Sequence, residues 1–356
     1  MITKQKVRTL KNIMEDQIKK NSKTVLVTGG LGFIGGHFID MLLEKGFAVV
    51  NIDKITYASN PKLNNLFSGN YPDRYRFIKR DINDLEELPY ADYIVHFAAE
   101  SHVDNSIIDG TVFTRSNVLG TQNLLNLLAK TRGKNLMHEW PMNQPEFIHI
   151  STDEVFGDIE AGFFKEHDRH NPSNPYAASK SAAEMLVVAY GRTYGIPYKI
   201  TRTTNNYGPR QHPEKLVPSC ITRGISGNKI RIHGTGNQKR NWIHVEDNCR
   251  AIFKVMLEGK VGEIYNISST EEYSVNDIAR MVLEKLGNRA DTATVDYVQD
   301  RSGQDIRYAL DSTKIKEALG WSAQSTFKDS IGDIIEYYKQ NRGNSRNGSA
   351  EGNIVL

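Results

Sequence analysis

The feature that most constrains the fold is a glycine-rich junction near the start of the chain. The run Thr24 to Thr28 (TVLVT) has the β-branched composition of a buried strand, and the apolar periodicity of Ile34 to Lys45 indicates a helix. Between them, Gly29, Gly32 and Gly35 have a G-x-x-G-x-x-G spacing. Glycines at such a junction permit a tight turn and let the pyrophosphate of a dinucleotide approach the positive N-terminus of the helix.

The next expected strand completes the pattern. Phe47 to Asp53 (FAVVNID) ends in a carboxylate about 20 residues after the glycines, where an acidic residue can accept hydrogen bonds from an adenosine ribose. A carboxylate at that place repels a 2′-phosphate, so the pattern favours NAD over NADP. Glycines alone would indicate only a tight turn; the strand, the helix and Asp53 together predict a dinucleotide site.

Strand-like runs and helical stretches keep alternating as far as Thr203. Further strands are expected at Tyr75 to Lys79, Tyr93 to Phe97, Phe147 to Ser151 and Tyr198 to Thr201. Beyond them, turns at Tyr207 to Pro213 and Gly234 to Gln238 interrupt the pattern. The sequence therefore predicts an α/β fold: a Rossmann-type doubly wound parallel sheet with a smaller C-terminal substrate-binding lobe.

Composition narrows the classes of partner. The chain has 356 residues and a net charge of +3 with both signs interspersed, so nucleic acid is not expected as a partner. No run approaches the about 18 apolar residues of a spanning helix, and the charged N-terminus has no apolar signal core, so no membrane association is expected. Cys220 and Cys249 lie in no metal-ligand spacing, which indicates no metal site and a reducing, cytoplasmic compartment.

A second chemical motif is Tyr176-Ala-Ala-Ser-Lys180. It follows the segment Asn171 to Pro175 (NPSNP), which is typical of a helix start, so the two side chains should lie one turn apart on one helix face. An ammonium group there can stabilise a phenolate, which makes the tyrosine a base near neutral pH, and can hold a nicotinamide ribose. A tyrosine that merely packs at a helix start is the alternative, and the dinucleotide pattern upstream disfavours it.

A third motif, Ser151 to Gly157 (STDEVFG), follows the fifth expected strand, at the strand end where open α/β sheets bind ligands. A pair of adjacent acidic residues ordinarily lies in a solvated loop, which is the competing interpretation. Here Thr152, Asp153 and Glu154 would emerge beside the nicotinamide, and a reaction that both removes and delivers protons needs an acid and a base in different environments. The motif is therefore interpreted as catalytic.

These residues resemble a known family. From Thr24 to about Tyr338 the chain resembles the extended short-chain dehydrogenase/reductases, and among them the nucleoside-diphosphate-sugar 4,6-dehydratases, most of all those of the dTDP-glucose type. The resemblance rests on TGGLGFIGGHF, DKITYASN, HFAAESHVDNSI, STDEVFGD, NPYAASK, NNYGPRQHPEKLVP, RNWIHVEDNCRAI and YNIS. STDEV discriminates best, because sugar-nucleotide epimerases of the same superfamily usually lack the Asp-Glu pair.

The resemblance implies a redox-neutral reaction that yields a 4-keto-6-deoxy sugar. Tyr176, assisted by Lys180 and Thr152, would take the proton of the 4-hydroxyl while tightly bound NAD, regenerated in each turnover, accepts hydride from C4. Glu154 would then remove the C5 proton as Asp153 protonates the leaving 6-hydroxyl. Hydride would finally return to C6.

The resemblance also assigns binding residues. Those expected to hold NAD are Gly29, Gly32, Phe33, Ile34, Gly35, Asp53, Lys54, Thr56, Asp81, Ile82, Phe97, Ala98, Ala99, Ser101, Tyr176 and Lys180. Those expected to hold the nucleotide sugar are Ser101, Thr152, Asn205, Lys215, Leu216, Pro218, Arg240 and Arg301. For Arg240, a surface ion pair is the competing interpretation.

The chain is accordingly divided into four parts. Residues 1–22 are an N-terminal extension, 23–202 an NAD-binding Rossmann domain to which later segments return, 203–338 mainly a nucleotide-sugar-binding lobe, and 339–356 a disordered tail. Segment 131–144 is expected to be an inserted surface loop. The family resemblance implies a homodimer through the helices spanning Ile107 to Ala129 and Tyr176 to Tyr194.

Some positions depart from the family pattern. Arg301-Ser-Gly-Gln-Asp305 stands where many of these enzymes have R-P-G-H-D, Phe156 where Tyr is usual, and His233 where an aromatic residue precedes a Gly-x-Gly turn. Several of these changes fall in the nucleotide-binding lobe, so dTDP-glucose is the leading substrate and UDP-, GDP- or CDP-linked hexoses or an N-acetylhexosamine are alternatives.

Other classes compete with the dehydratase interpretation. A nucleotide-sugar 4-epimerase or decarboxylase would share the glycine turn and the Tyr/Lys pair, but would have no use for Asp153 and Glu154 as an acid and a base. A non-catalytic NAD-binding scaffold would need neither Thr152 nor the Tyr/Lys pair.

Overall fold

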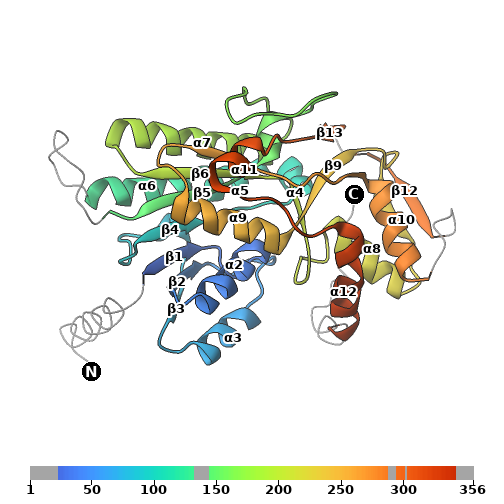
Figure 1. The fold of residues 1–356 in the computed structure, drawn as a ribbon, viewed down its shortest axis with the longest axis horizontal. Helices are drawn as coiled ribbons and strands as arrows, with labels where there is room; N and C mark the ends of the chain where they lie inside the picture. Colours follow the sequence, from blue (N-terminus) through green and yellow to red (C-terminus); the bar gives the residue numbers. More distant parts are fainter. Residues whose placement is uncertain (1–22, 132–143, 288–293, 301–302, 342–356) are drawn as a thin grey trace.

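The computed structural model describes residues 23–131, 144–287, 294–300 and 303–341, and in this part of the chain a seven-stranded parallel sheet forms the centre of the molecule (Figure 1). In order across the sheet, the strands are β10 (Ile264–Ile267), β6 (Tyr198–Thr203), β5 (Glu146–Thr152), β4 (Tyr93–His96), β1 (Thr24–Thr28), β2 (Ala48–Asp53) and β3 (Tyr75–Lys79). All neighbouring pairs run parallel. The predicted doubly wound α/β class is confirmed, and the six expected strands are present with small shifts at their ends.

The strand order places a topological switch at β1. The chain first builds β2 and β3 on one side of β1 and then β4, β5 and β6 on the other, so Val25 pairs with Val49 on one side and with Tyr93 on the other. Neighbouring loops leave a sheet in opposite directions at such a switch, and open α/β sheets bind their ligands there, at the carboxyl ends of the strands.

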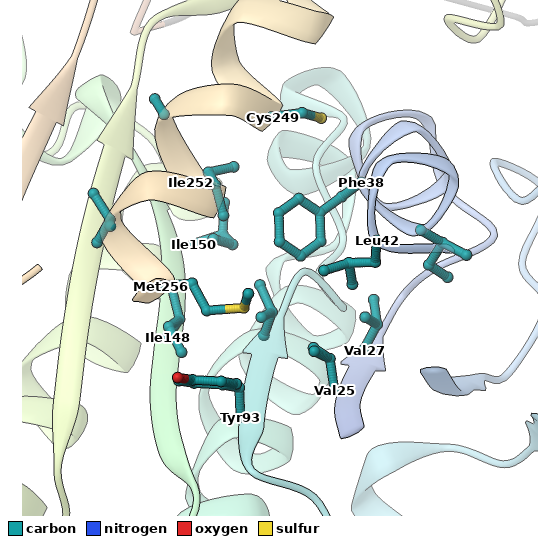
Figure 2. Close-up of a cluster of buried hydrophobic side chains, with 14 of the residues drawn as sticks. Val25, Val27, Phe38, Leu42, Tyr93, Ile148, Ile150, Cys249, Ile252 and Met256 are labelled. Carbon is teal, nitrogen blue, oxygen red and sulfur yellow. The ribbon is translucent and has the colours of Figure 1, made fainter. Parts of the chain in front are cut away.

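Helices cover both faces of the sheet (Figure 1). One face carries α2 (Phe33–Glu44), α3 (Lys62–Asn70), α9 (Val245–Glu258) and α11 (Thr313–Leu319), and the other carries α6 (Gly120–Thr131) and α7 (Pro175–Tyr194). Figure 2 shows Phe38 and Leu42 of α2 directed toward Ile252 and Met256 of α9 above the strands. Each such side chain contributes about 1.5–3 kcal/mol on burial, so this layer fixes the helix that follows the glycine turn.

The segment from Ile107 to Ala129 was expected to be helical, and it is, but it is not one continuous α-helix. The structure has α4 (Val103–Ile108), α5 (Gly110–Phe113), a π-helix η2 (Thr114–Leu119) and α6, with a break at Asp109. Asp109 is extended (φ −144°, ψ 97°), and its carboxylate accepts a hydrogen bond of 2.9 Å from the Thr111 N–H. An aspartate that caps a following helix ends the preceding one, because an extended residue cannot continue it.

The smaller lobe is built from the residues after β6. It contains β7 (Asn205–Tyr207), β8 (Ile230–His233), β9 (Lys239–His244), β11 (Glu272–Ser274), β12 (Val295–Val298), β13 (Arg307–Tyr308), α8 (Leu216–Ile225), α10 (Val275–Lys285) and α12 (Phe327–Gln340). Trp242, Ile278 and Phe327 lie in its separate apolar core. Within the same stretch of sequence, α9 and β10 return to the main sheet, and β10 is a strand that the sequence patterns did not reveal.

Several predictions about the ends and insertions lie outside the described residues: the extension 1–22, positions 132–143 of the predicted insertion, and the tail from 342. Helix α12 continues through Gln340, so residues 339 and 340 belong to a helix and not to the expected tail. No helix in the described ranges is long and apolar enough to cross a membrane. Cys220 and Cys249 are buried and free, and the cytoplasmic compartment stays a prediction.

Candidate active site

A cleft at the carboxyl ends of the strands gathers the predicted residues. All of the residues expected to hold NAD line it, and so do Thr152, Asp153, Glu154, Asn205 and Lys215. These side chains come from the ends of β1, β2, β4 and β5, from the start of α7 and from the loops of the smaller lobe. The sheet thus brings together groups that are more than a hundred residues apart in sequence.

The glycine turn is closed by main-chain contacts. The Gly29 N–H donates to the Ile52 carbonyl (2.8 Å) and the Gly32 N–H to the Gly29 carbonyl (3.1 Å). Gly29 has a φ of +72°, and a Cβ there would lie 2.6 Å from the amide nitrogen of Ala98. Helix α2 begins without a side-chain cap and without an acidic residue in its first turn. Its first N–H groups can therefore serve an anion in the cleft, as a dinucleotide pyrophosphate requires.

Asp53 is oriented by its own loop. Its carboxylate accepts hydrogen bonds from the Leu31 N–H (3.0 Å), the Ile55 N–H (2.8 Å) and the Ser59 hydroxyl (3.2 Å). Ile55 has a φ of +62°, which is rare and strained for a β-branched residue. This strained turn directs an N–H group at Asp53 and holds the carboxylate at the edge of the cleft.

The Tyr/Lys pair lies at the start of α7 as the spacing predicted. Both side chains are buried, and Lys180 Nζ donates to the Ile150 carbonyl over 2.6 Å. Burial lowers the pKa of Lys180 to about 8. Burial raises the pKa of Tyr176, and the charges of Glu154 and Asp153 raise it further. Lys180 is not among the groups that shift the pKa of Tyr176 here, and its role in lowering that pKa stays a prediction.

The two carboxyl groups of the STDEV motif lie in different environments. Thr152 donates its hydroxyl to Asp153 Oδ1 (3.1 Å), while burial, followed by the charge of Glu154, raises the pKa of Asp153 to about 7. Burial also raises the pKa of Glu154, but Arg240 and a hydrogen bond from Asn174 oppose that rise. A carboxyl group with a pKa near neutrality beside a second one that receives a hydrogen bond from Asn174 can serve as an acid next to a base.

A second pocket continues the cleft into the smaller lobe. Ser101, Glu154, Asn205 and Lys215 line both pockets, and Leu216 lines the second. Pro218 lines neither; it is buried within α8. Arg301 lies outside the described residues.

Arg240 also lines this second pocket, and it is not the surface residue of the competing interpretation. Its guanidinium donates to the carbonyls of Lys239 (2.7 Å), Asp305 (2.8 Å) and Ile306 (3.2 Å), and it lies 4.2 Å from the ring centroid of Tyr308. Only 7% of the residue is exposed. These carbonyls satisfy the donors of the buried guanidinium and fix its position beside the pocket.

Sequence reasoning missed several residues that line the two pockets. They include Ser59, Glu100, Ser116, Asn174, Asn206, Gln211, His212, Glu214, Arg231, Gln238, Asp305 and Tyr308. Glu100 and Ser116 both contact Lys54 Nζ, at 3.3 Å and 3.0 Å. For Asn174, the helix-start pattern NPSNP was a usable signal, since a residue before a helix-initiating proline commonly caps the helix.

The fold and the site together define a class. A doubly wound sheet, a glycine turn after its first strand, and a Tyr/Lys pair one helical turn apart in the same cleft are the features of an extended short-chain dehydrogenase/reductase.

Comparisons with known proteins extend this assignment. The family model described as GDP-mannose 4,6 dehydratase matches residues 26–334. The low-salt glycan biosynthesis protein Agl12 of Haloferax volcanii is 44% identical over 319 residues, covering 88% of this chain and 98% of the relative. A dTDP-glucose 4,6-dehydratase of Streptomyces niveus is 40% identical over 328 residues, covering 89% and 93%.

A solved structure agrees with these relatives. The dTDP-glucose 4,6-dehydratase DesIV of Streptomyces venezuelae, crystallised with NAD bound, has a TM-score of 0.83 and 40% identity, covering 90% of this chain and 98% of that one. The chain therefore belongs to the nucleotide-sugar 4,6-dehydratase family.

Proposed function

We propose that this protein is an NAD-dependent hydro-lyase that converts a nucleotide-activated hexose, with dTDP-glucose as the leading substrate, into its 4-keto-6-deoxy product. The observation that carries the proposal is the position of Asp153 and Glu154 in the same cleft as Tyr176 and Lys180. An oxidation site and an acid/base pair within one cleft match a reaction that oxidises C4 and then eliminates water. The relatives named dTDP-glucose 4,6-dehydratase support the choice of substrate.

The cofactor half of the cleft fits NAD. The uncapped start of α2 suits the pyrophosphate, Asp53 stands where a ribose would lie, and Ala98 and Ala99 leave room beneath the cofactor. NAD supplies a hydride acceptor for C4 and returns that hydride to C6. Lys180 holds the nicotinamide ribose in this assignment.

Oxidation at C4 uses Tyr176 and Thr152. Tyr176 takes the proton of the 4-hydroxyl, and the Thr152 hydroxyl orients that oxygen. Because burial, and after it the charges of the neighbouring carboxyl groups, raise the pKa of Tyr176, positive charge must face the phenol for it to ionise. Lys180 is the nearest cation of the motif, and its own pKa of about 8 allows a charged ammonium at neutral pH.

Elimination uses the two carboxyl groups in opposite senses. Once C4 is a ketone, Glu154 takes the C5 proton, electrons form the C5–C6 double bond, and the 6-hydroxyl leaves as water with a proton from Asp153. The pKa of about 7 keeps Asp153 protonated often enough near neutral pH to be the donor. Glu154, opposed in its pKa rise by Arg240 and Asn174, is the base. Hydride return to C6 and reprotonation of C5 complete the product.

The smaller lobe holds the nucleotide and sugar in this proposal. Ser101 and Asn205 face the sugar or its phosphates, Lys215 and Leu216 the nucleotide, and Arg240 the diphosphate. Lys215 already spans the two lobes, since its ammonium donates to the Ser101 carbonyl over 3.0 Å. Pro218 and Arg301 keep their assigned roles only as predictions. We likewise divide the chain as predicted, into an NAD-binding part at 23–202 with returning segments and a substrate lobe at 203–338.

A panel of nucleotide sugars with a mass-spectrometric readout tests the activity. We expect dTDP-glucose to lose one water without added cofactor, provided that NAD copurifies with the protein. An unchanged mass with a new sugar configuration would indicate an epimerase, and loss of carbon dioxide from a uronic acid a decarboxylase. Net accumulation of reduced cofactor would contradict the redox-neutral cycle. Faster dehydration of a UDP-, GDP- or CDP-linked sugar would change the assigned substrate but leave the assigned reaction unchanged.

A homodimer is the assembly we propose. Large apolar side chains are exposed on α4, α5, η2 and α7: Ile108 (81% exposed), Val112 (47%), Leu119 (50%) and Met185 (48%). An apolar face on the helices expected to pair is typical of an interface. Sedimentation of the purified protein as a monomer at micromolar concentration would contradict this assembly.

A further inference from the structure

Asn174 uses both ends of its amide group in different ways. Its Oδ1 accepts a hydrogen bond of 2.9 Å from the Ala177 N–H, which caps the start of α7. Its Nδ2 donates to Glu154 Oε2 over 3.4 Å. The residue is 8% exposed and lines the pocket of the smaller lobe. One side chain therefore contacts both the helix that carries Tyr176 and the carboxylate assigned to C5.

The segment that carries Asn174 is held against η3 (Asp153–Phe156). The Asn171 N–H donates to the Val155 carbonyl of η3 (3.0 Å). On its other side, the segment is tied to the residues before β13, because Ser173 donates its hydroxyl to Asp305 (2.6 Å). Gly157 has a φ of +73°, and a Cβ there would lie 2.2 Å from the Asn171 carbonyl oxygen. This close approach fixes the distance between the acid/base turn and the start of α7.

Charged and titratable groups surround Glu154 from every packed element. Arg240 comes from β9, Lys215 precedes α8, Asp305 and Tyr308 lie at β13, Tyr176 lies on α7 and Asp153 is its neighbour in sequence. The amide of Asn174, at the N-cap of α7, is a neutral donor within hydrogen-bond distance of the Glu154 carboxylate. A donor aimed at a carboxylate favours its ionised form.

We propose that Asn174 is a positioning residue for elimination: its amide nitrogen holds the Glu154 carboxylate ionised and in place, while its amide oxygen starts the helix that carries Tyr176. The inference rests on the proposed function, in which Glu154 is the base at C5. It links the two chemical steps through one side chain. An aspartate or serine can cap the helix equally well but cannot donate to Glu154 from an amide.

Two substitutions separate the two hydrogen bonds. Asn174→Ser keeps the cap and removes the amide donor, and Asn174→Asp keeps the cap and sets a negative charge beside Glu154. The readouts are solvent-deuterium exchange at C5 as a function of pH, and single-turnover oxidation at C4 followed by absorbance of the reduced cofactor.

For Asn174→Asp, we expect the acid limb of the pH profile of C5 exchange to move up by about one pH unit or more. For Asn174→Ser, we expect exchange to slow about tenfold. In both, C4 oxidation should stay within about twofold of wild type, since a role confined to Glu154 leaves the general base at C4 intact.

Ser312→Asp is the matched control, because it adds the same charge at the N-cap of α11, away from the cleft, and should leave the pH profile in place. An unmoved acid limb in Asn174→Asp would overturn the proposal. Equal slowing of C4 oxidation and C5 exchange in Asn174→Ser would also overturn it, because Asn174 would then act only as a helix cap. The serine variant can be compared with wild type even if the aspartate variant does not fold. Normal C5 exchange in Glu154→Gln would instead overturn the proposed function, so the two failures are distinguishable.

Discussion

The two halves of the cleft hold their groups in different ways. In the cofactor half, the backbone does most of the shaping: Gly29 packs against Ala98 with no room for a side chain, and the Asp53 carboxylate is set by N–H groups of its own loop. The parts come from the ends of neighbouring strands in one sheet. This half depends on steric fit, which changes little with pH.

The substrate half is held by side chains from distant segments. Glu154, Asn174, Arg240, Asp305 and Tyr308 contact or influence one another across more than 150 residues of sequence. Burial and the charges of neighbouring groups shift the pKa values of Glu154 and Tyr308, so the protonation state of each depends on its surroundings. The difference teaches that a substitution in the first half should act through packing, and one in the second through charge.

The largest effect should follow loss of the base in the substrate half. Glu154→Gln keeps the size of the side chain but cannot accept the C5 proton. We expect water loss and C5 deuterium exchange to fall by at least ~10²-fold while C4 oxidation persists, since general-base loss has that scale. Mass spectrometry, exchange and cofactor absorbance measure the three quantities.

Two variants sharpen that result. In Tyr176→Phe, C4 oxidation itself should slow by ~10²-fold or more, and every later step should slow with it.

Asp153→Asn should retain C5 exchange and slow elimination, because it lacks only the proton for the 6-hydroxyl. Normal dehydration by both Glu154→Gln and Asp153→Asn would contradict the assignment of these two residues as the base and the acid.

A smaller effect, of a different kind, is expected in the cofactor half. Gly29→Ala forces a Cβ into Ala98 at a φ of +72°, so we expect a loss of about 2 kcal/mol or more of unfolding free energy and weaker NAD retention. Thermal unfolding and the NAD content of the purified protein measure it. Gly69→Ala in α3 is the control: its Cβ meets no atom within 4 Å, and the change should stabilise the helix slightly. Equal melting of Gly29→Ala and wild type would break the steric account.

The smallest effect concerns the pH dependence of stability. The pKa of Asp153 is about 7 in the folded protein and about 3.9 when unfolded, so the folded state binds more protons between these values. The free energy of unfolding must then fall as pH rises through this window. Asp153→Asn removes that fall, so its free energy of unfolding should gain on that of wild type by on the order of 1 kcal/mol more at pH ~8 than at pH ~4. Parallel melting curves across pH would contradict the raised pKa.

The same division decided what the sequence could predict. The cofactor half is local: glycines, a strand end and an acidic residue follow one another within one βαβ unit, and all the residues expected there line the cleft. The STDEV and Tyr/Lys motifs were equally accessible, because each is short and stands at a strand end or helix start.

The substrate half was less accessible because its contacts are not local. For Arg240, the family resemblance predicted a binding role but the sequence could not exclude a surface ion pair, because its burial against Tyr308 depends on the pairing of β9 with β13. Pro218 was expected to line the pocket, but it is buried within α8 and lines neither pocket. Four-residue β10 escaped notice because its neighbour β6 lies more than sixty residues earlier, and no local pattern records that pairing.

That late strand has a consequence for synthesis of the chain. Ile264 pairs with Ile200, and the Thr204 N–H donates to the Ile267 carbonyl, so β6 keeps a bare outer edge until the residues of β10 have left the ribosome. An unpaired edge beside buried apolar residues is a template for association between nascent chains. A fragment cut between the two lobes would carry that edge permanently. The lobes differ in chemistry, yet they are one unit for folding.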